Sequence, residues 1–254
     1  MLNIFNCSGG KDSIAQILLA LEKGIKIDIV LYSEVRFQSG FEGSVSGELP
    51  EMRNFIFKTL VPFLEKTDKN IHFEHVTAQE TYLDVFFHYI ERSEKNKGRQ
   101  QGFPLPGRCW VNPRLKIKPI EKFLKGLKEP YQVYLGLAAD EQKRLSRLKL
   151  GQKSLLALYD ITEADCFKIC EKYGLLSPVY KYKKRCGCWF CPAQSKQDLI
   201  YLAHKEPDLF RGLIHLEEMS ETLCPIVPRF KHRDCAADLF QKCLNTPLKE
   251  ISHE

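Results

Sequence analysis

The sequence predicts a doubly wound α/β fold, in which helices cover both faces of a mostly parallel, five-stranded sheet. Three observations predict it: short apolar runs alternate with helical patterns, a glycine turn follows the first run, and the alternation stops near residue 175. A chain of 254 residues can hold one large domain with a small appendage. We therefore expect a sheet domain at 1–175 and a cysteine-rich, helical C-terminal region at 176–254 packed on it.

The expected strands are short runs of apolar, β-branched and aromatic side chains bounded by polar or turn residues. Because helical patterns separate these runs, crossover connections join neighbouring strands and make them parallel. Ligands bind such sheets at the carboxyl ends of the strands. In chain order, the expected strands are residues 2–5, 26–32, 71–76, 131–137 and 154–159.

The expected helices carry apolar residues three and four positions apart. The first follows the glycine turn and places Ile14, Ile17, Leu18 and Leu21 on one face. Residues 91–108 are polar and then proline-rich, which predicts a long loop. The further expected helices are residues 49–64, 81–90, 114–127, 195–204 and 207–221.

Composition narrows the class of protein. Hydrophobic residues make up 44%, which is ordinary for a globular chain, and no apolar stretch is long enough to span a bilayer. The N-terminus lacks the pattern of a signal peptide, so we expect a cytoplasmic protein with no membrane partner. A net charge of +6 is compatible with anionic substrates but does not demonstrate nucleic-acid binding.

Residues 8–13 read Ser-Gly-Gly-Lys-Asp-Ser and stand between the first expected strand and the first expected helix. The glycines let backbone N–H groups approach an anion, and the helix N-terminus adds the positive end of its dipole. The alternative is a serine-glycine turn that caps an ordinary helix. As a phosphate cradle, the segment offers Ser8, Gly9, Gly10, Lys11, Asp12 and Ser13.

Ten cysteines in a reducing compartment point to metal or redox chemistry where they cluster. Cys186, Cys188 and Cys191 lie within six residues, and Cys109 is the best candidate for a fourth ligand. Three interpretations stay open: a 4Fe–4S cluster, a structural Zn²⁺ site, or a redox pair of Cys188 and Cys191 without metal. If Cys109 also binds, every iron of a 4Fe–4S cluster has a protein ligand. If only the other three cysteines bind, one iron has no protein ligand and could hold a sulfur atom.

Residues 8–13 resemble the PP-loop of the ATP pyrophosphatases, a family that includes tRNA-thiolating enzymes, amide-forming synthetases and phosphoadenosine-phosphosulfate (PAPS) reductases. Three further segments are similar to motifs of the PAPS-reductase-like branch: residues 108–120, 135–147 and 159–165. The resemblance implies an adenine nucleotide alpha-hydrolase-like fold. The intact loop and the lack of a Glu-Cys-Gly-x-His tail separate the chain from true PAPS reductases. The cysteine segment with Trp189 looks closer to the sulfurtransferase of DNA phosphorothioation.

The resemblance implies that the protein binds ATP and Mg²⁺, adenylates an acceptor with release of pyrophosphate, and supports sulfur transfer. It implies as partners an adenine nucleotide, a nucleic-acid acceptor such as tRNA or DNA, and a cysteine desulfurase or other sulfur donor. It assigns catalytic roles to Lys11, Asp12, Asp140 and Glu141, and nucleotide contacts to the loop together with Gly136, Arg144 and Arg147.

Two alternative functions remain: a PAPS or adenylyl-sulfate reductase that acts on a sulfonucleotide, and a non-catalytic, metal-stapled nucleotide-binding subunit. Basic residues at 181–185, interleaved with Tyr180, Tyr182 and Trp189, are compatible with a nucleic-acid acceptor. Solvated helix faces explain most of the lysines equally well.

Overall fold

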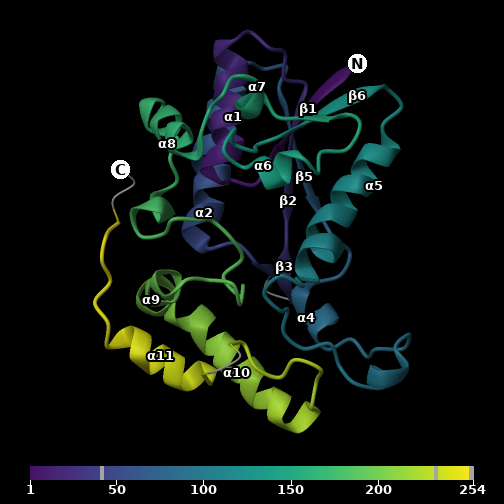
Figure 1. Cartoon of the computed structure of the whole chain (residues 1–254), viewed down its shortest axis with the longest axis vertical. Helices are drawn as coiled ribbons and strands as arrows, with labels where there is room; N and C mark the ends of the chain where they lie inside the picture. Colours follow the sequence, from purple (N-terminus) through teal and green to yellow (C-terminus); the bar gives the residue numbers. More distant parts are fainter. Residues whose placement is uncertain (41–42, 232–233, 252–254) are drawn as a thin grey trace.

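The structure, a computed structural model, describes residues 1–40, 43–231 and 234–251. A five-stranded sheet forms its centre, in the order β5–β2–β1–β6–β7, and every neighbouring pair is parallel (Figure 1). The predicted α/β class is therefore confirmed. The strands are β1 (Leu2–Cys7), β2 (Ile29–Glu34), β5 (His72–Thr77), β6 (Tyr131–Leu135) and β7 (Gln152–Lys153).

The central strand β1 sets the position of the site. Phe5 lies opposite Val30 of β2 on one side and Tyr134 of β6 on the other. The chain passes from β1 to β2 and later returns to place β6 on the opposite side of β1. The carboxyl ends of β1 and β6 thus flank the switch point of the sheet, which is where ligands bind in open α/β folds.

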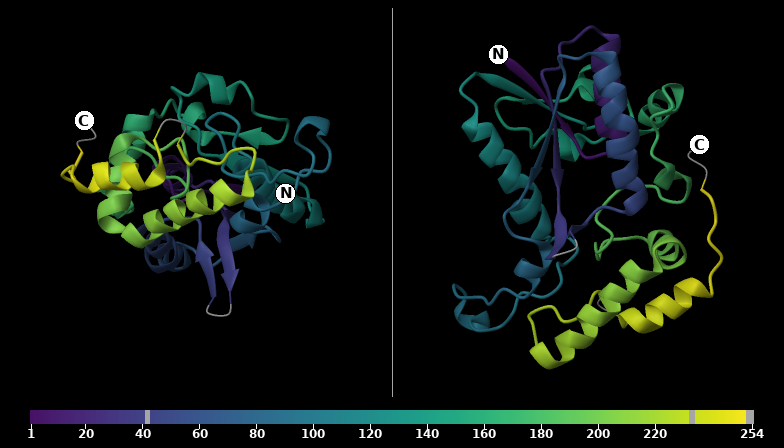
Figure 2. Two further views of the ribbon diagram at one scale, coloured as in Figure 1. Left: turned by 90° about the horizontal axis from the view of Figure 1, so that it is seen from below. Right: turned by 180° about the vertical axis from the view of Figure 1, so that it is seen from behind.

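Helices cover both faces of the sheet (Figure 2). One face carries α1 (Lys11–Glu22) and a continuous helical run made of α2 (Pro50–Phe55), η1 (Ile56–Leu60) and α3 (Val61–Thr67). The other face carries η3 (Asn112–Ile117) and α5 (Lys118–Gly126). There, side chains of the sheet and of α5 form one apolar cluster that includes Ile4, Ile29, Leu31, Ile120, Phe123 and Leu124.

The C-terminal region continues from α8 (Glu163–Lys172), which packs beside α1, through η4 (Pro178–Lys181). Helices α9 (Lys196–Lys205), α10 (Pro207–Leu223) and α11 (Ala236–Leu244) lie together beyond the carboxyl ends of the strands (Figure 1). Ser195 and Asp198 form a capping box that begins α9. Within the described ranges, no helix combines the length and apolar character that a membrane crossing requires.

The expected strand at residues 154–159 is wrong. The fifth strand is the two-residue β7, and the following residues form the short helix α7 (Leu155–Leu158). The Ser154 hydroxyl accepts the N–H of Ala157 at 3.2 Å and donates to the carbonyl of Leu137 at 2.6 Å. This cap satisfies a first-turn N–H and favours a helix over an extended strand.

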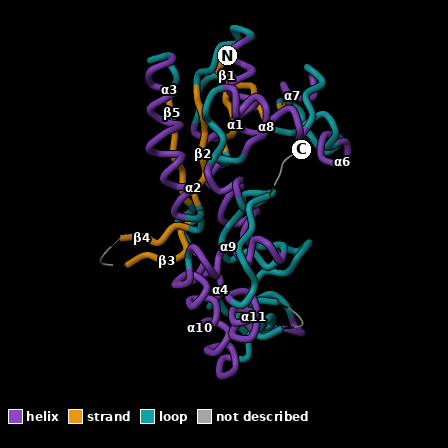
Figure 3. Tube along the Cα trace, turned by 90° about the vertical axis from the view of Figure 1, so that its left-hand side faces the viewer, coloured by secondary structure: helices purple, strands orange, loops and turns teal. Residues whose placement is uncertain are grey.

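Four other segments differ from expectation. The expected helix at 81–90 ends early, as α4 (Tyr82–Phe86), and the chain then doubles back through a bridge between Tyr89 and Gln100. An unexpected hairpin of β3 (Arg36–Gly40) and β4 (Gly43–Ser46) projects from the sheet (Figure 3). The short helices η2 (Glu94–Asn96) and α6 (Gln142–Leu145) were also not expected.

Candidate functional site

The turn between β1 and α1 is held by its own side chains. The hydroxyl of Ser13 accepts the N–H of Ser8 at 3.1 Å and donates to the carbonyl of Gly10 at 2.8 Å. Gly9 has a φ of +73°, and a Cβ placed on it would lie 2.7 Å from Cδ1 of Ile56. The positive φ therefore requires glycine at this position, whereas the contact is with the far end of the Ile56 side chain, which can shift.

Helix α1 begins at Lys11 without a side-chain cap. The N–H groups of Asp12 and Ser13 have no hydrogen-bond partner in the described part of the chain. Such first-turn N–H groups carry the positive end of the helix dipole. They leave two donors available for an anion at the carboxyl end of β1.

Lys11 is buried, with 4% of the residue exposed. Its Nζ lies 2.6 Å from Oδ1 of Asp12, 3.3 Å from Oε2 of Glu163, and 5.1 Å from the centre of the Phe167 ring. Burial alone lowers the pKa of this ammonium group, but the hydrogen bonds and charges of Asp12 and Glu163 outweigh it, so the pKa is raised. Lys11 is a fixed positive charge beside the turn.

The segment after β6 packs directly on the start of α1. A Cβ placed on Gly136 would lie 2.7 Å from both Cα and N of Ser13. This close approach brings the loop after β6 to the glycine turn, and with it the ion pair of Glu141 and Arg144.

These elements enclose a polar cavity of about 150 Å³, which we call the anion cavity. The sequence-predicted residues that line it are Ser8, Gly10, Lys11, Asp12, Ser13, Gly136, Glu141 and Arg144. Three predicted residues lie outside this lining. Gly9 is buried below the turn, Asp140 accepts the N–H of Glu163 at 3.2 Å, and Arg147 is exposed.

The cavity also contains residues whose role the sequence did not predict. Glu163 begins α8, Tyr180 belongs to η4, and Lys184 and Arg185 directly precede Cys186. Neither Lys184 nor Arg185 forms an ion pair within the residues that the structure describes. Because Lys11 and Arg144 already face carboxylates, these two cations leave the mouth of the cavity with unpaired positive charge. In the sequence, the only feature that could have indicated this role is that Lys184 and Arg185 directly precede Cys186.

A second cavity of about 490 Å³ adjoins the first, and Ser8, Ser13, Gly136 and Arg144 border both. Its volume is typical of small-molecule sites, which span about 300–1,000 Å³. Asn6 lines it, and the Oδ1 atom of this side chain is buried without a hydrogen-bond partner among the described residues. Its apolar lining comes from both the sheet and α5 and includes Leu31, Ile120, Leu124, Val133, Leu135 and Leu137.

The four cysteines predicted to bind metal lie in two different surroundings. Burial raises the pKa of Cys188 to about 12, with Lys116 opposing and the thiols of Cys191 and Cys109 adding to the shift. Burial also raises the pKa of Cys186 to about 12, but this thiol hydrogen bonds to Tyr180 and lines the anion cavity.

Across residues 1–40, 43–231 and 234–251, no group of three or more His, Cys, Asp or Glu side chains is arranged to hold a metal ion. In this arrangement the four thiols do not form one ligand set. Metal binding by Cys109, Cys186, Cys188 and Cys191 stays a prediction.

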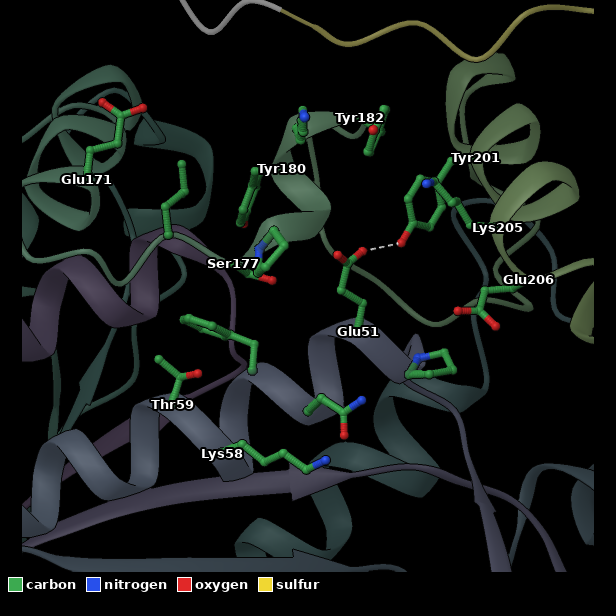
Figure 4. Close-up of a pocket in the computed structure, with 16 residues that line it drawn as sticks. Glu51, Lys58, Thr59, Glu171, Ser177, Tyr180, Tyr182, Tyr201, Lys205 and Glu206 are labelled. Carbon is green, nitrogen blue, oxygen red and sulfur yellow. Dashed lines mark hydrogen bonds between the residues drawn. The ribbon is translucent and has the colours of Figure 1, made fainter.

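The aromatic residues expected to stack on nucleic-acid bases are mostly inaccessible. Trp189 and Tyr180 are only 1% and 3% exposed, respectively. Tyr182 is half-buried and borders a separate cavity of about 960 Å³ between α2 and α9 (Figure 4). There the Tyr201 hydroxyl donates to Glu51 at 2.6 Å, and three lysines balance three glutamates in the lining. This wall is not a basic groove, and a nucleic-acid acceptor stays a prediction.

Comparison of the chain with protein-family models, with curated proteins and with solved structures gave no match.

Proposed function

We propose that the protein is a PP-loop ATP pyrophosphatase with an adenine nucleotide alpha-hydrolase-like fold, which adenylates an acceptor for sulfur transfer. One observation carries the proposal: the turn at residues 8–13 presents free first-turn N–H groups to a cavity that Lys11, Arg144, Lys184 and Arg185 also line. Backbone donors and several cations around one small cavity suit a polyphosphate.

The adjoining cavity suits the rest of an adenine nucleotide. Its apolar lining accommodates a planar base, and the unpartnered Oδ1 of Asn6 offers an acceptor for an amino group. Because the two cavities share Ser8, Ser13 and Gly136, a nucleotide with its phosphates in the anion cavity reaches the larger one without a break. A sulfonucleotide has the same base and sugar as ATP. The two ligands therefore differ at the phosphate end, which is the part that the anion cavity would bind.

In the proposed reaction, an acceptor oxygen attacks the α-phosphorus of ATP. An O–P bond forms, the bond from the α-phosphorus to the bridging oxygen breaks, and its electron pair leaves with pyrophosphate. A sulfur nucleophile from a donor, such as a cysteine desulfurase, then displaces AMP from the acceptor. Lys11 and the first-turn N–H groups stabilise the charge that develops on the leaving pyrophosphate.

The carboxylates around the cavity have separate tasks in this proposal. Asp12 and Glu163 are the oxygen donors that would hold Mg²⁺, which neutralises phosphate charge when bound. Glu141 orients Arg144 toward the phosphates through their ion pair. Asp140 holds the first N–H of α8 and so fixes Glu163.

Cys109, Cys186, Cys188 and Cys191 remain the residues proposed to bind a 4Fe–4S cluster or Zn²⁺. A cluster supplies electron transfer or, with one iron open, a place for a sulfur atom. No step of the proposed reaction passes through this group, because the described thiols do not gather into one ligand set.

The test is pyrophosphate release from ATP, measured with and without candidate nucleic-acid acceptors. Acceptor-dependent release supports the proposal. Sulfite production from a sulfonucleotide without ATP cleavage would replace it with a reductase. Nucleotide binding with neither product would indicate a non-catalytic subunit.

A further inference from the structure

Tyr180 connects the glycine turn to the cysteine segment. The residue belongs to η4 and is 3% exposed, and its side chain borders both the anion cavity and the cavity drawn in Figure 4. Its hydroxyl oxygen accepts the backbone N–H of Lys11 at 2.8 Å. The same hydroxyl hydrogen bonds to the side chain of Cys186. One oxygen atom therefore contacts both the first residue of α1 and a thiol at the wall of the cavity.

A tyrosine hydroxyl has a single proton to donate. Since the oxygen of Tyr180 accepts from Lys11, its proton is directed to the other side, where Cys186 lies. Both Tyr180 and Cys186 line the anion cavity. An anionic oxygen in that cavity is a much stronger acceptor than a thiol sulfur, so it competes with Cys186 for this proton.

The surroundings hold the ring in place while the proton changes partner. The Tyr180 ring packs edge-on against Phe167, with ring centres 5.3 Å apart, and Phe167 lies 5.1 Å from Nζ of Lys11. A Cβ placed on Gly10 would lie 3.4 Å from the Tyr180 hydroxyl. Lys11 thus contacts Tyr180 through its backbone N–H and Phe167 through its Nζ. With the ring held in place, rotation of the Tyr180 O–H bond alone is enough to direct its proton to another acceptor.

We propose that Tyr180 is a positioning residue that adds a side-chain donor to the phosphate cradle and withdraws it from Cys186 when the polyphosphate of a nucleotide binds. This inference rests on the proposed function. It also predicts that nucleotide binding and the Tyr180–Cys186 hydrogen bond oppose each other. Binding of the polyphosphate breaks this hydrogen bond, and the hydrogen bond in turn lowers the affinity for the nucleotide by the same free energy.

The first experiment measures the affinity for Mg·ATP by calorimetry in Tyr180→Phe. Loss of one hydrogen bond to a charged group is expected to weaken binding about tenfold. Tyr173→Phe is the matched control, because its hydroxyl donates to Glu22 on the surface at 2.7 Å, away from the cavity. It is expected to bind ATP like the wild type.

The second experiment tests the coupling, which a merely structural role of Tyr180 would not produce. Cys186→Ala removes the competing acceptor, so ATP should bind about threefold more tightly, and this gain should vanish when Tyr180→Phe is added. Because Cys186 is also a proposed metal ligand, Cys188→Ala controls for loss of a bound metal. Cys243→Ala, at a buried site on α11, controls for loss of a thiol elsewhere.

Either experiment alone can overturn the inference. Unchanged ATP affinity in Tyr180→Phe, or an equal gain from Cys186→Ala with and without the tyrosine hydroxyl, rejects the role of Tyr180 while leaving the proposed function intact. A wild-type protein that takes up no ATP rejects both.

Discussion

The backbone N–H of Lys11 donates a 2.8 Å hydrogen bond to the hydroxyl of Tyr180, a residue 169 positions further along the chain. This contact joins the glycine turn after β1 to the segment that precedes the cysteines. Lys184 and Arg185 reach the anion cavity from the same segment. The site is therefore built from segments that lie far apart in the sequence.

Gly136 is expected to be essential for the close contact between the loop after β6 and α1. In Gly136→Ala the new Cβ would meet backbone atoms of Ser13 at 2.7 Å, which a flexible side chain cannot relieve. We expect a loss of about 1–3 kcal/mol in the free energy of unfolding, together with weaker ATP binding. Thermal unfolding and calorimetry measure the two effects.

Gly126→Ala is the matched control, because a Cβ there meets nothing within 4 Å at the end of α5. It is expected to leave ATP affinity unchanged and to raise stability slightly. Equal behaviour of the two variants would contradict the close approach at Gly136.

Two arginines from one predicted motif are expected to behave differently. Arg144 lines the anion cavity beside Glu141, whereas Arg147 is exposed and outside the lining. Arg144→Ala removes a phosphate donor and frees a carboxylate, so ATP affinity should fall about tenfold. Arg147→Ala should change it by less than about twofold. Titration of both variants with Mg·ATP checks this, and the reverse order would refute the placement of the loop.

The sequence predicted the parts of the site that depend on local chemistry. Glycines adjacent to a helix start predict an anion cradle because their conformational freedom and the helix dipole are local properties. The cavity residues from 8–13 and from the loop after β6 were found in this way. The sheet was also predicted correctly, because periodicity is local, although β7 was displaced by a capped helix at Ser154.

The remaining parts depend on tertiary contacts that no local pattern encodes. From the sequence, Tyr180 is compatible with base stacking, yet it is buried against Lys11 because η4 returns to the start of α1. The sequence did not predict the hairpin of β3 and β4, because residues outside the hairpin hold it in place. The Ser46 hydroxyl donates to Glu34 at 2.6 Å, and the Trp189 ring N–H donates to the Ser46 carbonyl at 2.8 Å.

Glu34 is expected to make stability depend on acid pH. Burial alone raises its pKa, but hydrogen bonds from His75, Ser46 and Arg53 outweigh burial and lower it from 4.5 to about 2. A lowered pKa means that the unfolded chain binds the proton more tightly. The contribution of Glu34, about 3 kcal/mol, is therefore fully present above pH 4.5 and lost as the pH falls toward about 2.

Denaturant unfolding from pH 7 to pH 2.5 tests this in Glu34→Gln, with Glu65→Gln, exposed on α3, as the control. The stability of Glu34→Gln should start lower at pH 7 and fall less with acid. Parallel curves for wild type and Glu34→Gln would contradict the assignment.

Metal content tests the thiol prediction. Anaerobically purified protein with a 4Fe–4S cluster should be brown and carry about four irons per chain. Cys109→Ala or Cys188→Ala should remove the metal. Cys224→Ala, which removes an exposed thiol outside the proposed ligand set, should not. One zinc and no colour would replace the cluster by a zinc site, and no metal at all would contradict both.

The central claim is that the turn at residues 8–13 binds the phosphates of ATP. Calorimetry with Mg·ATP on wild type, Lys11→Ala and Lys23→Ala tests it most directly, because Lys11 lines the cavity whereas Lys23 lies at the opposite end of α1 over Tyr159. We predict that the wild type and Lys23→Ala bind alike and that Lys11→Ala loses about 100-fold in affinity. No uptake by the wild type, or equal affinity in Lys11→Ala, would contradict the claim.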